Sequence, residues 1–123
     1  MAIPIFFRIF AKISRNMKKA EILEKIFDTL MEKGTVSEKA DILGEEPMED
    51  KVYIKRIKIG EDIKSNGVEL VYVSITSYKE DFSDASVTNM RINLKNAYDK
   101  WVNCFATEFD KTALSIIYET VCV

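Results

Sequence analysis

The sequence contains no histidine among its 123 residues. This absence excludes serine–histidine and cysteine–histidine nucleophile pairs and every histidine metal ligand. Glycine is also scarce: the four glycines lie 10, 16 and 7 residues apart, a spacing that matches neither the dinucleotide-binding fingerprint nor the Walker phosphate loop. We therefore expect no catalytic residue, no cofactor site and no metal site, and these absences weigh against an enzyme.

Cysteine and long apolar runs are scarce as well. The two cysteines, Cys104 and Cys122, are too few for a disulfide scaffold and favour a reducing compartment. We expect Cys104 to be a buried packing residue, and neither thiol has a partner base in the sequence. No apolar run approaches the roughly 20 residues that cross a bilayer. A cytoplasmic protein is the expectation.

Residues 51–78 predict two adjacent antiparallel strands. In the first, Val52, Ile54, Ile57 and Ile59 alternate with polar residues, and a slip of phase at Lys55–Arg56 predicts a β-bulge. The pair Asn66-Gly67 tolerates positive φ and closes the hairpin.

The second of these strands is apolar on both faces. Leu70 and Tyr72 are expected on one face, and Val71, Val73 and Ile75 on the other. Such a strand is typical of the centre of a sheet.

The N-terminal third predicts helices. Residues 18–33 carry apolar side chains at helical spacing, and Gly34 is expected to end this helix. The stretch Thr35-Val-Ser-Glu38 matches a capping box, which predicts a short second helix that ends at Gly44.

The C-terminal half predicts one long helix and one strand. Apolar residues between Val87 and Phe105 recur every three or four positions, which favours a helix of about five turns capped by Ser83. The alternative makes residues 85–93 a third strand and starts the helix near Leu94. Residues 113–123 alternate in two apolar sets, which predicts a terminal strand.

These elements predict an α+β fold in one domain of residues 1–123. It contains N-terminal helices, an antiparallel β-hairpin, a long helix and a C-terminal strand, and helices cover the small antiparallel sheet. Such a sheet has two open edges, and long apolar edge strands promote association between chains. We therefore expect self-association.

The first sixteen residues are a candidate docking or anchoring segment. They are rich in Phe and Ile, and residues 1–20 contain five basic residues and no acid. The segment either packs on its own sheet, docks on a partner subunit or lies on a membrane surface as an amphipathic helix or targeting peptide. The expected contact residues are Phe6, Phe7, Phe10 and Ile13.

Residues 18–43 resemble the opening of a winged helix-turn-helix domain, with a helix, a glycine and then T-V-S-E-K-A-D-I-L as the second helix. In that family a recognition helix follows and enters the major groove of DNA. Here residues 44–50 are acidic and contain Pro47, so phosphates would repel them. With a net charge of -2, the sequence argues against a nucleic acid partner.

Charged clusters offer two weaker candidates. Six carboxylates would need convergent geometry to catalyse a reaction or to hold a cation, and a solvated acidic loop is the simpler interpretation. They are Glu45, Glu46, Glu49, Asp50, Glu61 and Asp62. The first strand also carries a basic group, which consists of Lys51, Lys55, Arg56 and Lys58 together with Tyr53. These residues form either a basic sheet face that stacks nucleotides or a charged edge strand that prevents aggregation. We favour edge protection.

The leading functional hypothesis is a non-enzymatic protein-interaction or assembly module that self-associates or binds another protein. The second is a small-molecule-binding or enzymatic domain whose pocket, between the long helix and the sheet, is lined by Tyr72, Tyr98, Trp101 and Tyr118. The third is a peripheral membrane protein anchored by residues 3–19.

Overall fold

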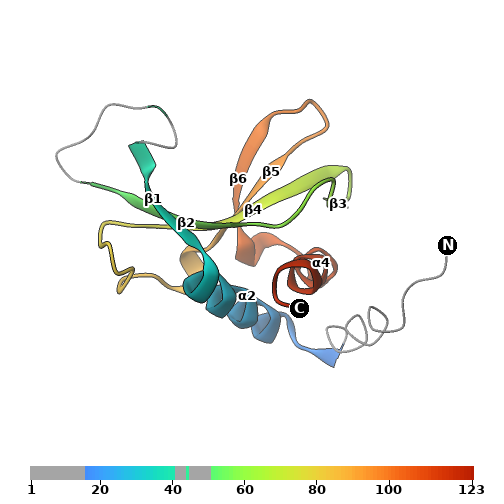
Figure 1. The fold of residues 1–123 in the computed structure, drawn as a ribbon. Coiled ribbons are helices and arrows are strands. Elements are labelled where there is room, and N and C mark those ends of the chain that lie inside the picture. Colours follow the sequence, from blue (N-terminus) through green and yellow to red (C-terminus); the bar gives the residue numbers. More distant parts are fainter. Residues whose placement is uncertain (1–15, 41–43, 45–50) are drawn as a thin grey trace.

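The structure is a computed structural model that describes residues 16–40, 44 and 51–123. Two helices and a six-stranded antiparallel open sheet are mixed along the chain, which confirms the α+β class (Figure 1). The elements in chain order are α2 (Lys19–Lys33), β1 (Thr35–Glu38), β2 (Tyr53–Lys58), β3 (Lys64–Ser65), β4 (Val68–Ser77), η1 (Val87–Asn89), β5 (Arg91–Lys95), β6 (Trp101–Phe105), η2 (Ala106–Glu108) and α4 (Lys111–Val121).

The strands lie in the order β1-β2-β4-β5-β6, and every neighbouring pair is antiparallel. The short strand β3 pairs with the start of β4. The central position expected for β4 is confirmed, because this strand has β2 and β3 on one side and β5 on the other.

The predicted hairpin is present as β2 and β4, with β3 in the connection. Its turn residues Asn66 and Gly67 have φ of 51° and 80°, as a tight two-residue hairpin turn requires. The bulge predicted at Lys55–Arg56 is wrong, because the register between β2 and β4 is regular there.

The irregularity lies in β4 instead, between Leu70 and Tyr72. The expectation that these two residues share a face is therefore wrong. Leu70 joins Val73 and Ile75 in the core, and Tyr72 turns to the opposite face. One extra residue in a strand has this effect because side chains alternate with a period of two.

Helix α2 confirms the predicted N-terminal helix, and its apolar stripe buries Ile22, Leu23, Ile26 and Leu30. Gly34 follows the helix as predicted, for a steric reason. A Cβ atom there would lie 2.5 Å from the carbonyl oxygen of Leu30 and 2.5 Å from Cγ of Lys55. The ammonium of Lys55 donates a hydrogen bond of 3.1 Å to the carbonyl of Met31, which joins β2 to the end of the helix.

The short helix expected from Thr35 is wrong over residues 35–38, which form the edge strand β1 paired with β2. Pairing along β2 satisfies backbone groups of both strands, and this outweighs a local capping signal. Residues 41–43, which that expected helix would include, lie outside the described residues.

The long helix predicted over residues 87–105 is also wrong. This segment forms η1 and the antiparallel strands β5 and β6. Ile92 and Leu94 alternate with polar neighbours at the period of a strand and are buried. The alternative strand over residues 85–93 overlaps β5, which begins only at Arg91. The helix that this alternative starts near Leu94 is wrong, because Leu94 lies in β5 and residues 101–105 form β6.

The predicted C-terminal strand is wrong as well, because residues 111–121 form α4. The carboxylate of Asp110 accepts a hydrogen bond of 2.9 Å from the backbone of Ala113 and caps the helix N-terminus. Ala113, Leu114 and Ile117 are the buried residues of the helix, at spacings of one and three. A segment apolar on two alternating faces also fits a helix with a wide apolar stripe.

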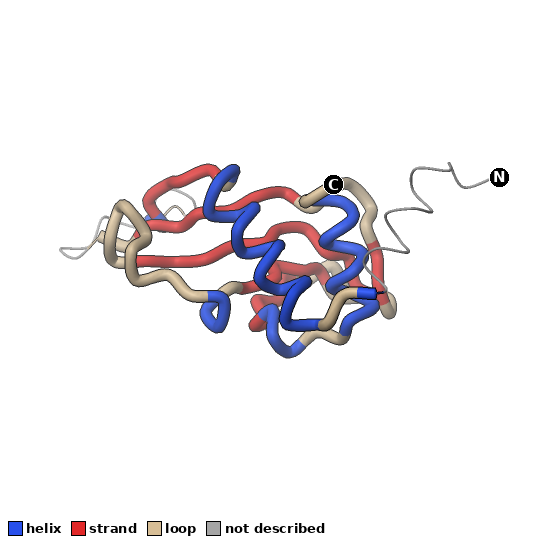
Figure 2. The backbone as a smooth tube through the Cα atoms, turned by 90° about the horizontal axis from the view of Figure 1, so that it is seen from below, coloured by secondary structure: helices blue, strands red, loops and turns tan. Residues whose placement is uncertain are grey.

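Helices α2 and α4 contact each other and lie on the same side of the sheet, as Figures 1 and 2 show. Between these layers lies one hydrophobic core with residues from both helices and from β4 and β5, together with Phe82 and Met90. In the part of the chain that the structure describes, no helix covers the other face of the sheet. The same residues contain no helix long and apolar enough to cross a membrane.

Candidate functional site

The face of the sheet turned away from both helices is the candidate site, and we call it the open face. Strand residues alternate between the two faces, so the neighbours of the buried Ile92 and Leu94 point outward. The charged, aromatic and amide residues of the open face, with Ser74 among them, are Arg56 and Lys58 of β2, Lys64 of β3, Glu69, Tyr72 and Ser74 of β4, Arg91, Asn93 and Lys95 of β5, and Trp101, Asn103 and Phe105 of β6. Toward β1 the face continues with Thr35, Ser37, Ile54 and Thr76.

The register arranges these side chains in three rows across the strands. The first row is Arg56, Ser74, Arg91 and Phe105; the second is Lys58, Tyr72, Asn93 and Asn103; and the third is Glu69, Lys95 and Trp101. Each of these three rows therefore contains a cation and an aromatic ring, whereas the row of Ser37, Ile54 and Thr76 contains neither. Lys64 of β3 pairs with Glu69, so the face carries five cations and one carboxylate, whereas the whole chain has a net charge of -2.

Cations and rings are in direct contact on this face. The guanidinium of Arg91 lies 3.6 Å from the centroid of the Phe105 ring, and that of Arg56 lies 4.4 Å from the centroid of the Tyr72 ring. The ammonium of Lys95 lies 5.0 Å from the Trp101 ring. Such contacts hold long side chains in defined positions.

Tyr72 and Trp101 stack on each other although their strands are not neighbours. Their ring centroids are 6.2 Å apart and the ring planes differ by 22°. Strand β5 runs between β4 and β6, so the two rings approach each other across it. Tyr72 is half-buried, whereas 57% of Trp101 is exposed.

The two arginines have no ionic partner among the described residues. The ion pairs in this part of the chain are Lys51–Glu38, Lys58–Glu61 and Lys95–Asp99. Contact with Glu61 raises the pKa of Lys58, and contact with Lys58 lowers the pKa of Glu61. Arg56 and Arg91 thus carry positive charge that no described carboxylate neutralises.

The hydroxyl of Ser74, in the first row, donates a hydrogen bond of 2.8 Å to the side-chain oxygen of Asn93, in the second row. Ser74 is buried although it lies on this face, because its row neighbours Arg56 and Arg91 flank it. This hydrogen bond fixes the orientation of the Asn93 amide in the middle of the face.

Of the four aromatic residues predicted to line a pocket, the structure brings two together. Tyr72 and Trp101 stack on the open face. Tyr98 lies in the turn between β5 and β6 with 83% of its surface exposed, and Tyr118 is on α4, packed against the core. The four residues therefore lie in three places.

The other predicted contact residues are Phe6, Phe7, Phe10 and Ile13, which lie outside the described residues. The basic group expected on the first strand divides between the faces of the sheet. Lys55 and Tyr53 are directed toward the core side, while Arg56 and Lys58 are on the open face. Lys51 precedes β2 and pairs with Glu38, which raises the pKa of Lys51.

Sequence reasoning did not identify Arg91, Asn93 and Phe105 as site residues. The signal was present in R-I-N-L-K and W-V-N-C-F, where alternate residues of each strand share a face. A helix over the same segment would distribute these residues around its circumference, so the helical interpretation did not place them on one face.

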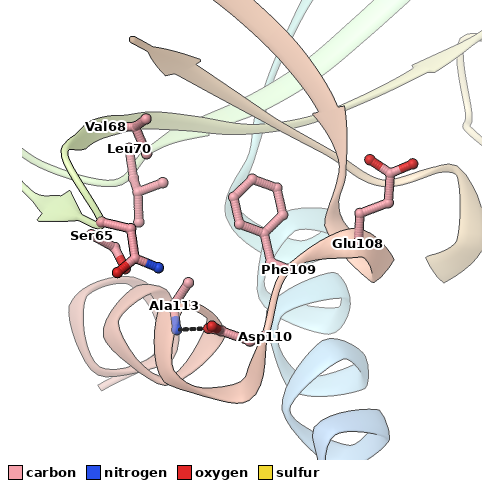
Figure 3. Close-up of a pocket in the computed structure, with 8 residues that line it drawn as sticks. Ser65, Val68, Leu70, Glu108, Phe109, Asp110 and Ala113 are labelled. Atoms are coloured by element: carbon pink, nitrogen blue, oxygen red, sulfur yellow. Dashed lines mark hydrogen bonds between the residues drawn. The ribbon is translucent and has the colours of Figure 1, made fainter. Parts of the chain in front are cut away.

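A second feature is an open hollow of about 230 Å³ between the turn before β4 and the start of α4. Figure 3 shows the ring of Phe109 directed toward Leu70, and the carboxylate of Glu108 directed away from it. Asp110 is engaged in capping α4. The hollow is smaller than the roughly 300–1,000 Å³ of ligand pockets, and its two carboxylates do not converge.

Within the described residues no group of three or more metal-ligating side chains is present. The candidate carboxylates Glu45, Glu46, Glu49 and Asp50 lie outside those residues. Cys104 is half-buried against the core. Cys122 accepts a hydrogen bond of 3.2 Å from the hydroxyl of Thr29, and burial raises the pKa of its thiol.

Comparison of the chain with models of protein families, with curated proteins and with solved structures finds no match. The function must therefore be inferred from the site itself.

Proposed function

We propose that this protein is a non-enzymatic binding module whose open face binds an anionic partner. The observation that carries the proposal is the combination of Arg56 and Arg91 in one cross-strand row, without an ionic partner among the described residues. Charge complementarity then favours a partner that carries negative groups.

The geometry supports binding in preference to catalysis. Arg56, Arg91 and Lys95 lie on ring faces, and the carboxylates of Glu61 and Asp99 pair with Lys58 and Lys95, so these charges are not arranged around a cavity. A flat face of stacked rings and cations has instead the composition of a contact surface, in which aromatic residues and arginine are enriched.

Retention on a polyanion matrix tests the proposal. We expect the wild-type protein to bind immobilised heparin at low salt, and Arg56→Gln/Arg91→Gln to elute at clearly lower salt. The matched control is Lys25→Gln/Lys33→Gln, which also removes two positive charges, but from exposed positions of α2 on the other side of the sheet. Equal elution of the two double variants, or no retention of the wild type, would contradict the proposal.

A second candidate is self-association through the edge strand β6. Its sequence W-V-N-C-F contains no charged residue, and among the described strands only β5 pairs with it. Natural edge strands are commonly protected by charge or proline. Antiparallel pairing of β6 with the same strand of a second copy would satisfy its free backbone groups and join two open faces.

The solution mass measured by light scattering after gel filtration tests this second candidate. We expect a dimer for the wild type and a monomer for Val102→Lys, which places charge on the edge strand. Val123→Lys, at an exposed position outside the sheet, is the control and should remain a dimer. A truncated chain that begins at Met17 distinguishes a dimer contact through β6 from one through residues 1–16. Loss of the dimer in the truncated chain would assign the contact to the N-terminal segment.

A further inference from the structure

We infer that the anionic partner is single-stranded nucleic acid, with its bases on the rings of the open face and its phosphates on the cations. This inference rests on the proposed function and adds the chemical class of the partner. It differs from the DNA-binding mode considered for residues 18–43, because it uses the sheet and needs no recognition helix.

The first argument is the stacking platform. Trp101 is 57% exposed, and the Tyr72 ring stacks on it with the ring planes 22° apart. Every nucleic acid base has a π-face, so exposed rings bind bases with little dependence on sequence. The guanidinium planes of Arg56 and Arg91, each fixed over a ring, are additional surfaces on which unpaired bases stack.

The second argument is the alternation of rings and cations. Rows on one face of a sheet are about 7 Å apart and strands about 4.8 Å apart, so three rows over four strands cover about 14 Å in each direction. Sheets of four strands that bind RNA stack two or three bases on such an area. Each of these three rows supplies both a ring and a cation, which matches a strand whose bases and phosphates alternate.

The third argument is the pair of amides at the centre. Asn93 and Asn103 face each other across β5 and β6, and an unpaired base presents hydrogen-bonding edges that amides recognise. A duplex hides the base faces that the rings would contact, and an acidic polypeptide uses the cations but not the rings. The composition of the face therefore favours single strands over both.

Trp101 is the only tryptophan of the chain, so its fluorescence reports directly on the site. The test titrates the wild-type full chain with dT12, rU12, a 12-base-pair DNA duplex and poly-L-glutamate at low salt. We expect dT12 or rU12 to quench Trp101 and to bind more tightly than the duplex or the polyglutamate. The slope of log K against log salt should fall by about 1.4 in Arg56→Gln/Arg91→Gln, because each phosphate contact with a single strand contributes about 0.7.

Substitution of the ring on β4 separates stacking from charge. Tyr72→Ala should weaken binding of a fluorescently labelled dT12 by about 5- to 150-fold, the range for loss of one stacked base. Tyr72→Phe keeps the ring and should bind as the wild type does, which assigns the effect to the ring and not to the hydroxyl. The circular dichroism spectrum of Tyr72→Ala should match that of the wild type, which excludes a loss of folding. Tyr98→Ala removes an exposed ring in the adjacent turn and should have no effect.

The outcomes separate the two levels of the proposal. Quenching by single strands that depends on Tyr72 supports the inference. Equal or tighter binding of the duplex or of polyglutamate, or binding that Tyr72→Ala leaves unchanged, overturns the assignment to single-stranded nucleic acid while the anionic-partner function stands. If none of the four polymers binds, both proposals are wrong.

Discussion

The two faces of the central sheet are built from the same strands but have opposite compositions. On β5 the side chains of Ile92 and Leu94 are buried beneath the helices, whereas their neighbours Arg91 and Asn93 lie on the open face. The covered face supplies the burial that stabilises the fold. The open face is therefore available for contacts that folding does not require, and it carries cations and rings in contact with one another.

The largest expected effect is a difference in the free energy of unfolding between variants of two adjacent residues. Ile92→Ala should lower the free energy of unfolding by about 2–5 kcal/mol, because it opens a cavity in the core. Arg91→Gln should lower it by less than about 1 kcal/mol, the scale of an exposed cation–π contact. Urea denaturation followed by circular dichroism measures both. Similar losses for the two variants would show that the open face also supports folding.

The second prediction concerns two glycines with different roles. Gly34→Ala should cost about 1–3 kcal/mol, because its Cβ would contact the Leu30 carbonyl and the Lys55 stem on the covered side. Gly34→Asn should be no better. Gly67 has φ of 80° and open space around it, so Gly67→Asn should cost less than about 1 kcal/mol, since Asn adopts this conformation readily. Thermal unfolding of the three variants is the measurement, and tolerance of Gly34→Asn would contradict the steric explanation.

The third prediction tests whether a buried polar contact underlies the open face. Asn93→Ala removes the partner of the buried Ser74 hydroxyl and should cost about 1–3 kcal/mol. Adding Ser74→Ala to it should cost less than the sum of the two single changes, because the unpaired hydroxyl is then removed. A double-mutant cycle from urea denaturation gives the coupling. Strict additivity would mean that this hydrogen bond contributes nothing.

The smallest expected effect concerns a covered thiol. Burial raises the pKa of Cys122, so the native state retains this proton more tightly than the unfolded chain. The group therefore stabilises the fold below the pKa that the thiol has in the unfolded chain, and the contribution is lost as pH rises through the native pKa. Alkylation of Cys122 followed by mass spectrometry should be slower than that of an unburied thiol at pH 8 and should accelerate at higher pH.

A control for this thiol is Thr29→Val. The Thr29 hydroxyl donates to Cys122 and by itself lowers the pKa of that thiol. Removing the donor should slow alkylation further at the same pH. Faster alkylation in this variant would indicate instead that the end of α4 has opened.

Local signals predicted the fold only where they agreed with the tertiary environment. Helix α2 and the hairpin of β2 and β4 were correctly predicted, since Gly34 and the pair Asn66-Gly67 mark their ends unambiguously. Residues 87–105 have apolar positions that fit both periods, so spacing alone favoured a helix where two strands form. The candidate site was hidden for the same reason, because Arg91 and Phe105 share a face only when both are in strands.

The sequence by itself determined the α+β class, the helix before Gly34, the tight turn at Asn66-Gly67 and the central position of β4. These depend on local periodicity and on backbone conformations that few residues adopt. Tertiary structure alone decided the strands β1, β5 and β6, the bulge that turns Tyr72 outward and the pairing of that ring with Trp101. Cross-strand contacts join residues far apart in the chain, and their free energy is gained only when the sheet assembles.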